Sequence, residues 1–145
     1  MPVLVHPASL RHALPICKLE MQCFGWMRSL FGLWQRVGQR DVSAWIAYND
    51  GRASGYLIAY PREIDGEPVA YVGGVGVAAH AQRRGIGREL MLSCMDRSPR
   101  VWLHVRAPNT PAVRMYESLQ FSVRERIADF YQNGDDALIM ANWQR

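Results

Sequence analysis

A strand pattern that runs directly into a glycine- and arginine-rich loop constrains the fold of this chain more than any other feature. The strand pattern covers residues 69–77 and is rich in valine, and the loop and the start of a helix follow at residues 82–89. Gly73, Gly74 and Gly76 lie inside the strand pattern. Glycine weakens a strand and often marks a position where a ligand or another backbone comes close. We therefore expect the edge of this strand to bind an extended ligand.

The loop after the strand has the features of an anion site. Gly85 and Gly87 leave the first backbone N–H groups of the next helix uncovered, and a helix start carries unpaired donors and a positive dipole end. Arg83, Arg84 and Arg88 add positive charge and forked donors that suit phosphate oxygens. The sequence therefore predicts a phosphate cradle at the start of this helix.

The order Gln82-Arg-Arg-Gly-Ile-Gly87 resembles the (Q/R)-x-x-G-x-(G/A) pyrophosphate loop of the GNAT family of N-acetyltransferases. Its position between a strand and an amphipathic helix strengthens the match. The resemblance implies acetyl-coenzyme A (acetyl-CoA) as co-substrate, with the backbone of the strand holding the pantetheine arm and the acetyl oxygen. The residues expected to bind it are Val75, Gly76, Val77, Gln82, Arg83, Arg84, Gly85, Ile86, Gly87 and Arg88.

A dinucleotide-binding fingerprint is the alternative interpretation of the same stretch. Gly74-Val-Gly-Val-Ala-Ala79 fits the loose G-x-G-x-x-(G/A) pattern, and Asp96 follows about twenty residues later, as that fingerprint requires. We reject it because Asp96 lies near the end of a helix pattern instead of at the end of a strand. The glycines also fall inside the strand pattern and not at its turn.

Length and composition favour one α/β (α+β) domain over residues 1–145, because 145 residues with 49% hydrophobic content can bury a core. No apolar run approaches the ~20 residues of a membrane span, and no signal-peptide pattern opens the chain. Cys17, Cys23 and Cys94 are odd in number and lack metal-site spacing, so we expect reduced thiols, no metal and a cytoplasmic location. The net charge of +4 comes with arginines clustered only at residues 83–88, which favours a polyanionic cofactor over nucleic acid.

Apolar periodicity and turn residues predict about seven strands and four helices. The expected strands are 3–6, 44–48, 53–60, 69–77, 101–105, 121–127 and 137–141, and the expected helices lie around 16–23, 27–37, 86–97 and 110–119. Turns at residues 49–51 and 61–66 imply an antiparallel meander, and the strand–helix–strand unit after it implies a parallel pair. Thr110 is predicted to cap the last helix, with Pro111 at its first position. The expected fold is a mixed, mostly antiparallel sheet with helices on both faces, and the GNAT resemblance adds that the central parallel pair splays apart.

A second and longer resemblance covers residues 101–121 and 128–140, which are similar to the RimI-like protein N-terminal acetyltransferases. It implies Tyr116 as general acid to the leaving thiolate, Asn109 as a contact of the cofactor arm and Tyr131 as an acceptor contact. The GNAT resemblance likewise implies an acceptor site near Phe24 and Trp26. The alternatives are a packed tyrosine at 116, a capping residue at 109, a surface tyrosine at 131 and core packing at 24 and 26.

His104 departs from the RimI-like pattern, which has a glutamate general base at this position. A histidine can serve as a base near neutral pH, but it can also be a neutral core residue in the strand. His12 and His80 are predicted to lie on the surface. Gln120 also departs from the pattern, since it replaces a glycine, and a positive φ there would strain it.

The two resemblances imply an acetyl-CoA-dependent N-acetyltransferase acting on a protein or peptide α-amine. The His104 departure leaves a small-molecule amine acetyltransferase open, and a non-catalytic acyl-CoA-binding domain is the alternative outside enzymes. A monomer or homodimer without nucleic-acid or membrane partners is expected.

Overall fold

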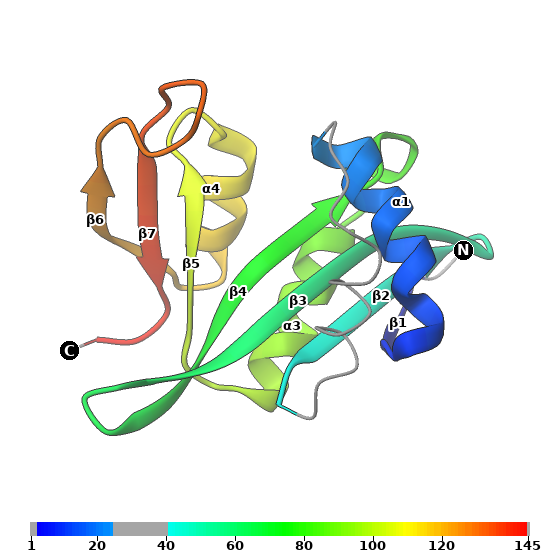
Figure 1. Cartoon of the computed structure of the whole chain (residues 1–145), viewed down its shortest axis with the longest axis horizontal. Helices are drawn as coiled ribbons and strands as arrows, with labels where there is room; N and C mark the ends of the chain where they lie inside the picture. Colours follow the sequence, from blue (N-terminus) through cyan, green and yellow to red (C-terminus); the bar gives the residue numbers. More distant parts are fainter. Residues whose placement is uncertain (1–2, 25–40, 145) are drawn as a thin grey trace.

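The computed structural model describes residues 3–24 and 41–144, and it has the expected mixed sheet (Figure 1). The strand order is β1-β2-β3-β4-β5-β7-β6, in which β4 and β5 run parallel and the other neighbours run antiparallel. The strands are β1 (Val3–Pro7), β2 (Ser43–Asn49), β3 (Arg52–Ile64), β4 (Glu67–Val77), β5 (Val101–Arg106), β6 (Ser122–Ile127) and β7 (Ala137–Ala141).

Helices cover both faces of the sheet, as predicted (Figure 1). A 3₁₀ turn, η1 (Leu10–His12), leads into α1 (Ala13–Phe24), which packs on one face. The opposite face carries α3 (Ile86–Arg97) and α4 (Thr110–Ser118), and a second 3₁₀ turn, η2 (Ala79–Ala81), follows β4. The helix predicted at 27–37 lies outside the described residues.

Two apolar cores follow from the alternation of side chains along the strands. On β3, Leu57 and Ala59 face α3, whereas Tyr56 and Ile58 face α1 together with Ile16. All five of these residues are buried. The sheet is therefore buried on both faces at its centre, which explains why β3 has an almost continuous apolar run instead of a polar–apolar alternation.

The turn predicted at residues 61–66 is wrong, because β3 continues through this segment to Ile64. The turn itself is Asp65-Gly66, with φ of 53° and 79°, and two such positive φ values are typical of a tight hairpin. Beyond Ala59, β3 pairs with β4 but no longer with β2. Pro61 therefore lies where β3 is an edge strand, and proline is better tolerated there than inside a sheet.

The parallel pair separates part of the way along β4, and Figure 1 shows the two strands diverging. Their pairing runs from Ala70–Val101 to Val72–Leu103 and then ends. At this point the register between β3 and β4 shifts by one residue, which leaves Gly73 as an extra residue in β4. A β-bulge of this kind bends and twists its strand. The bulge thus accounts for the predicted splaying, which is confirmed.

Candidate active site

The edge of β4 that faces β5 is open beyond the bulge. Within the described chain, residues 73–77 have no paired strand on that side, and Val75 and Val77 pack against the core under α3. Backbone groups on an open edge can hydrogen-bond an extended ligand as a strand would. The three positions predicted to hold the cofactor arm, 75–77, lie on this edge.

Glycine is required in β4 for a different reason from the one that we expected. A Cβ atom on Gly73 would lie 2.5 Å from Cε2 of Tyr60, and one on Gly76 would lie 2.9 Å from Cε1 of Tyr56 and 3.0 Å from Sγ of Cys23. These contacts come from side chains of this chain on the α1 face. The glycines therefore accommodate aromatic rings and the end of α1, and they are not in themselves evidence for a ligand.

The start of α3 is an uncapped helix N-terminus. Its cap residue, Gly85, has a left-handed backbone with φ of 77°, and no side chain bonds the first N–H groups. Nothing lies within 4 Å of the position where a Gly85 Cβ would be, and Arg83 and Arg84 are exposed beside it. Free N–H donors, the helix dipole and two guanidinium groups match the needs of a diphosphate. The loop therefore fits the phosphates of the predicted co-substrate.

Other side chains of this loop have structural partners. The Gln82 side-chain amide donates to the Val77 carbonyl at 3.3 Å, which ties the loop back to β4. Arg88 donates to Oγ of Ser118 at 2.9 Å and so connects α3 with α4. Ile86 is buried in the core, which leaves only its backbone to face a ligand.

The caps of α4 determine where Tyr116 lies. The predicted cap Thr110 is wrong: Asn109 is the N-cap, and its Oδ1 accepts from the Ala112 N–H at 3.4 Å. At the other end the Gln120 N–H donates to the Glu117 carbonyl and the Phe121 N–H donates to the Tyr116 carbonyl, both at 3.0 Å. This pair of bonds forms a Schellman motif. It places the Phe121 ring against Tyr116, with centroids 5.9 Å apart.

Tyr116 is buried, with 4% of its surface exposed. Burial, and then the nearby Tyr131 hydroxyl, raise the pKa of Tyr116 to about 12. The phenol therefore stays protonated at neutral pH. Within the described residues its hydroxyl has no hydrogen-bond partner, so it remains able to donate a proton.

His104 forms a polar pair with Tyr71 across the parallel strands. The Tyr71 hydroxyl lies 3.1 Å from Nδ1 of His104, and the His104 ring stacks on Phe130 at a centroid distance of 4.9 Å. Burial lowers the pKa of His104, and the charge of Glu125 opposes this shift. The imidazole is therefore largely neutral near pH 7 and can accept a proton.

The segment between β6 and β7 carries Phe130 and Tyr131, and Asp135 makes several of the contacts that hold it. The backbone carbonyl of Asp135 accepts the N–H groups of both aromatic residues at 3.1 Å, and its carboxylate accepts from Arg106 and Asn133. The Arg106 guanidinium also lies 5.9 Å from the Tyr131 ring centroid. These contacts fix the backbone of Phe130, whose ring stacks on His104, and of Tyr131, whose ring lies against that of Phe130.

A model of the acetyltransferase (GNAT) family matches residues 10–121. The chain belongs to this family. Its fold agrees with this assignment, because it superposes on Arabidopsis thaliana NAA60, solved in complex with a bisubstrate analogue, with a TM-score of 0.84 over 97% of each chain at 21% identity. The predicted GNAT fold is thus confirmed.

Curated relatives of this GNAT chain include two protein acetyltransferases. It is 31% identical over 99 residues to the N-terminal acetyltransferase A complex catalytic subunit ard1 of Schizosaccharomyces pombe, which covers 62% of this chain and 56% of the relative. It is 37% identical over 75 residues to the [ribosomal protein bS18]-alanine N-acetyltransferase of Salmonella typhimurium, covering 46% and 51%. The chain thus matches about half the length of each.

The GNAT chain brings most of the predicted site residues to one region around the open edge of β4. The loop at 82–88 lies beyond the end of β4, and His104 lies on the neighbouring strand. The charge of Tyr131 acts on Tyr116, and that of Tyr71 acts on Tyr131. Trp26 lies outside the described residues, and of Phe24 the structure gives only its place as the last residue of α1.

Tyr71 is the residue that the sequence reasoning missed. It lies in the strand pattern just before the glycines and had no assigned role. Its register partner on β5 is Trp102, which lies two residues before His104 in the sequence. A parallel register between β4 and β5 was needed to connect it with His104, and no sequence motif gave that register.

Metal ligands and membrane-spanning helices were also sought in the described part of the chain. Residues 3–24 and 41–144 contain no cluster of three or more His, Cys, Asp or Glu side chains suited to a metal ion. Their helices are all too short or too polar to cross a bilayer.

Proposed function

We propose that this chain is an acetyl-CoA-dependent N-acetyltransferase that acylates a primary amine, most often the α-amine of a protein or peptide. The observation that carries the proposal is the Tyr71–His104 pair beside the open edge of β4, in a chain whose next loop is an uncapped, arginine-flanked helix start. Proton-accepting groups and a phosphate cradle on the same sheet suit transfer from an acyl-CoA to an amine.

The residues divide the required proton transfers between them. The neutral amine nitrogen attacks the thioester carbon, a C–N bond forms, and the C–S bond breaks. His104, whose pKa is lowered by burial, accepts a proton from the amine, directly or through a water molecule. Tyr116, whose pKa is raised to about 12, donates its proton to the departing sulfur. Backbone N–H groups of residues 75–77 hold the acetyl oxygen as it gains charge.

The co-substrate is assigned by fit of the residues present. The N–H groups that open α3 and the side chains of Arg83 and Arg84 would bind its diphosphate, and the edge of β4 would bind the pantetheine arm. Asn109 already accepts a bond from Ala112 as the cap of α4, so its side-chain NH₂ is the group free to contact this arm.

The acceptor is inferred from the relatives and from the aromatic wall next to His104. One curated relative is named as the catalytic subunit of the N-terminal acetyltransferase A complex, and the other as a [ribosomal protein bS18]-alanine N-acetyltransferase. The Phe130 ring stacks on His104, where an acceptor amine must approach the base, and the Tyr131 ring packs against Phe130. Our candidates for acceptor contacts are Tyr131, Phe24 as the last residue of α1, and Trp26, which lies outside the described residues.

The test is release of CoA thiol from acetyl-CoA by the wild type and by Tyr116→Phe, His104→Gln and Tyr71→Phe. Tyr48→Phe and His6→Ala are matched controls, because these residues lie on β2 and β1, away from the parallel pair. We expect Tyr116→Phe and His104→Gln to lose about a hundredfold or more in kcat with unchanged acetyl-CoA affinity. Full activity of both variants would contradict the assigned roles.

The acceptor class is tested with a panel of short peptides and free small amines. Preferential turnover of peptides through their α-amine supports the proposal. Turnover of free amines alone would make the chain a small-molecule acetyltransferase, and binding of acetyl-CoA without turnover of any amine would make it an acyl-CoA-binding domain.

The proposal also includes a cytoplasmic location and an oligomeric state for this chain. Cys17, Cys23 and Cys94 are present as thiols, and thiols are typical of proteins kept in a reducing cytoplasm. One relative is named as the catalytic subunit of a complex, whereas we propose that this chain acts as a monomer or homodimer. Sedimentation of the purified chain measures the latter directly.

A further inference from the structure

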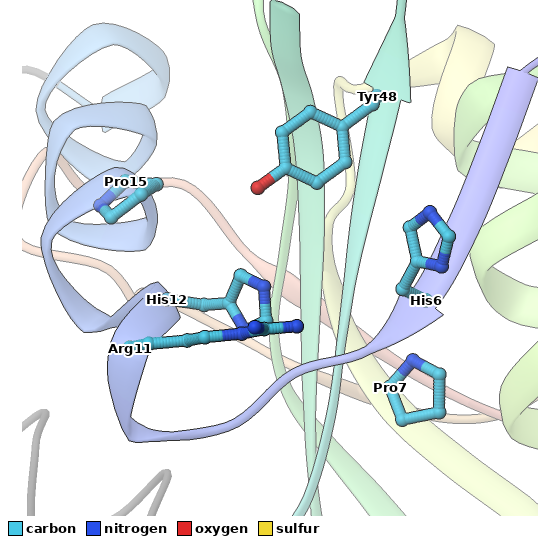
Figure 2. Close-up of a pocket in the computed structure, with 6 residues that line it drawn as sticks. All are labelled: His6, Pro7, Arg11, His12, Pro15 and Tyr48. Atoms are coloured by element: carbon cyan, nitrogen blue, oxygen red, sulfur yellow. The ribbon is translucent and has the colours of Figure 1, made fainter. Parts of the chain in front are cut away.

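A separate pocket opens between the start of α1 and the first two strands (Figure 2). It has a volume of about 620 Å³ and is lined by His6, Pro7, Arg11, His12, Pro15 and Tyr48. This volume is within the range of about 300–1,000 Å³ that is usual for small-ligand sites. Strand β3 separates β2 from the parallel pair, so the pocket is distinct from the candidate active site.

The pocket is lined by basic groups and by no carboxylate. Figure 2 shows Arg11 and His12 reaching from η1 toward the space opposite His6, with Tyr48 above them. Among the charged groups that act on His12, Arg11 has the largest effect, and no acidic side chain contributes. The pocket is therefore an electropositive site whose charge the described chain leaves uncompensated.

His12 is oriented as a hydrogen-bond donor. The prediction that it lies on the surface is wrong, because 7% of its surface is exposed. The Ser9 N–H donates to Nδ1 of His12 at 2.9 Å, so Nδ1 is an acceptor and the proton of the neutral ring is on Nε2. Burial and the charge of Arg11 lower the pKa of His12, which favours this neutral form. In the described chain Nε2 has no partner.

Arg11 supplies charge to the same space. It is exposed, and within the described residues its guanidinium has no hydrogen-bond or ion-pair partner. Its forked donors suit two oxygens of one anionic group. The prolines and the Tyr48 ring, which lies edge-on to His6 with centroids 6.0 Å apart, form apolar walls for the rest of a ligand.

We propose that this pocket binds the phosphate or carboxylate group of a small anionic ligand, with the Arg11 guanidinium and the His12 Nε2–H as its donors. An oxyanion there would accept from both the His12 Nε2–H and the Arg11 guanidinium. The site is independent of acetyl transfer, and neither the family nor the relatives assign it.

The test is an NMR titration of the full chain with inorganic phosphate and, separately, with acetate, at constant ionic strength. The imidazole signals of His6 and His12 report on the pocket, and that of His104 reports on the proposed active site. We expect saturable shifts at His6 and His12 that are absent at His104. Shifts that grow linearly without saturation, or that are equal at all histidines, would overturn the proposal.

Two variants locate the anion. Arg11→Gln should weaken the binding seen at His12 about tenfold, because a charge-assisted hydrogen bond is lost. Arg84→Gln is the matched control: it removes a guanidinium from the phosphate cradle of α3 and should leave the His12 shifts unchanged. Unchanged binding in Arg11→Gln, with its thermal unfolding as in the wild type, would show that the pocket is not the site.

The two probes distinguish the ligand chemistries. Tighter binding of phosphate points to a phosphorylated ligand, and tighter binding of acetate points to a carboxylate. Saturable binding of either one supports the proposal, whereas failure of both to saturate overturns it. Because the readout does not depend on CoA release, it separates this proposal from the proposed function.

Discussion

At the scale of single residues, the least expected feature is Gln120 at the end of α4. It has φ of 72°, a left-handed conformation that glycine adopts without strain. Its N–H still completes the Schellman motif that places Phe121 against Tyr116. The strain anticipated for a positive φ at this position is therefore present, and it lies directly beside the proposed acid.

Replacing Gln120 with glycine should stabilise the chain. Relief of the left-handed strain, about 1–2 kcal/mol, outweighs the extra flexibility of the unfolded chain, about 0.4–1 kcal/mol. We expect the free energy of unfolding, measured by urea denaturation, to rise by about 0.5–1 kcal/mol. Glu117→Gly, inside α4, is the control and should lower it. A loss of stability in Gln120→Gly would show that the glutamine side chain has a role of its own.

At the scale of elements, the start of α3 depends on the backbone conformation of Gly85. Its φ of 77° turns the loop into the helix while the first N–H groups remain uncapped. No neighbouring atom would touch a Cβ there, so the requirement for glycine is conformational and not steric. The same element thus explains both the helix boundary and the phosphate cradle.

Gly85→Ala should weaken acetyl-CoA binding about tenfold, since forcing alanine into a left-handed conformation costs about 1–2 kcal/mol and shifts the loop. Gly51→Ala is the matched control, because Gly51 has φ of 73° in the β2–β3 turn and equally open surroundings. Calorimetric titration with acetyl-CoA should show a loss of affinity in the first variant alone. Equal affinities in both variants would mean that the loop conformation does not matter for binding.

The β6–β7 segment is the second element that serves the site. Asp135 accepts from the backbone of Phe130 and Tyr131 and from the side chain of Arg106. Asp135→Ala removes the carboxylate contacts and should loosen the aromatic wall. Because exposed ion pairs contribute about 0–1 kcal/mol, we expect little change in stability.

For Asp135→Ala the kinetic expectation is a KM for the amine acceptor that is about three- to tenfold higher, with the KM for acetyl-CoA unchanged. Asp65→Ala, in the exposed β3–β4 turn, is the control and should leave both values unchanged. A rise in the KM for acetyl-CoA alone would place the segment on the cofactor side of the site.

At the scale of the whole molecule, two histidines at distant places respond to pH in the same sense. Burial lowers the pKa of His12, beside η1, and of His104, on β5, from 6.5. The unfolded chain then binds more protons than the folded chain as pH falls below about 6.5, so stability rises with pH in this range. The stability that the two neutral histidines contribute is complete above pH 6.5. It is lost as the pH falls through their lowered pKa values in the folded chain.

We expect the melting temperature to be lower at pH 5 than at pH 7 in buffers without phosphate or carboxylate. The double variant His12→Gln/His104→Gln should show a smaller difference between the two pH values, whatever its absolute stability. Asp135 and Asp136, whose pKa values are lowered from 3.8, contribute to pH dependence only below about pH 4. An unchanged difference in the double variant would show that other groups control acid stability.

The sequence by itself determined the elements of this protein and the cofactor-loop motif. Helix α3 begins and ends where the pattern of residues 86–97 predicted, and the antiparallel meander and the parallel pair followed from short turns and one crossover. These features are local, because periodicity, a glycine at a turn and a charged loop each depend only on residues that are close together in the sequence. The predicted N-cap of α4 was wrong by one residue, because Asn109 and Thr110 are neighbours and both residue types cap helices well.

The tertiary structure alone decided which distant side chains meet. Tyr71 pairs with His104 because β4 and β5 align in one parallel register, and Gly73 and Gly76 are needed because the rings of Tyr60 and Tyr56 lie against them. His12 is buried, although its sequence neighbours led us to predict a surface position. Contacts between residues far apart in the chain depend on register and layer packing, which local sequence patterns do not encode.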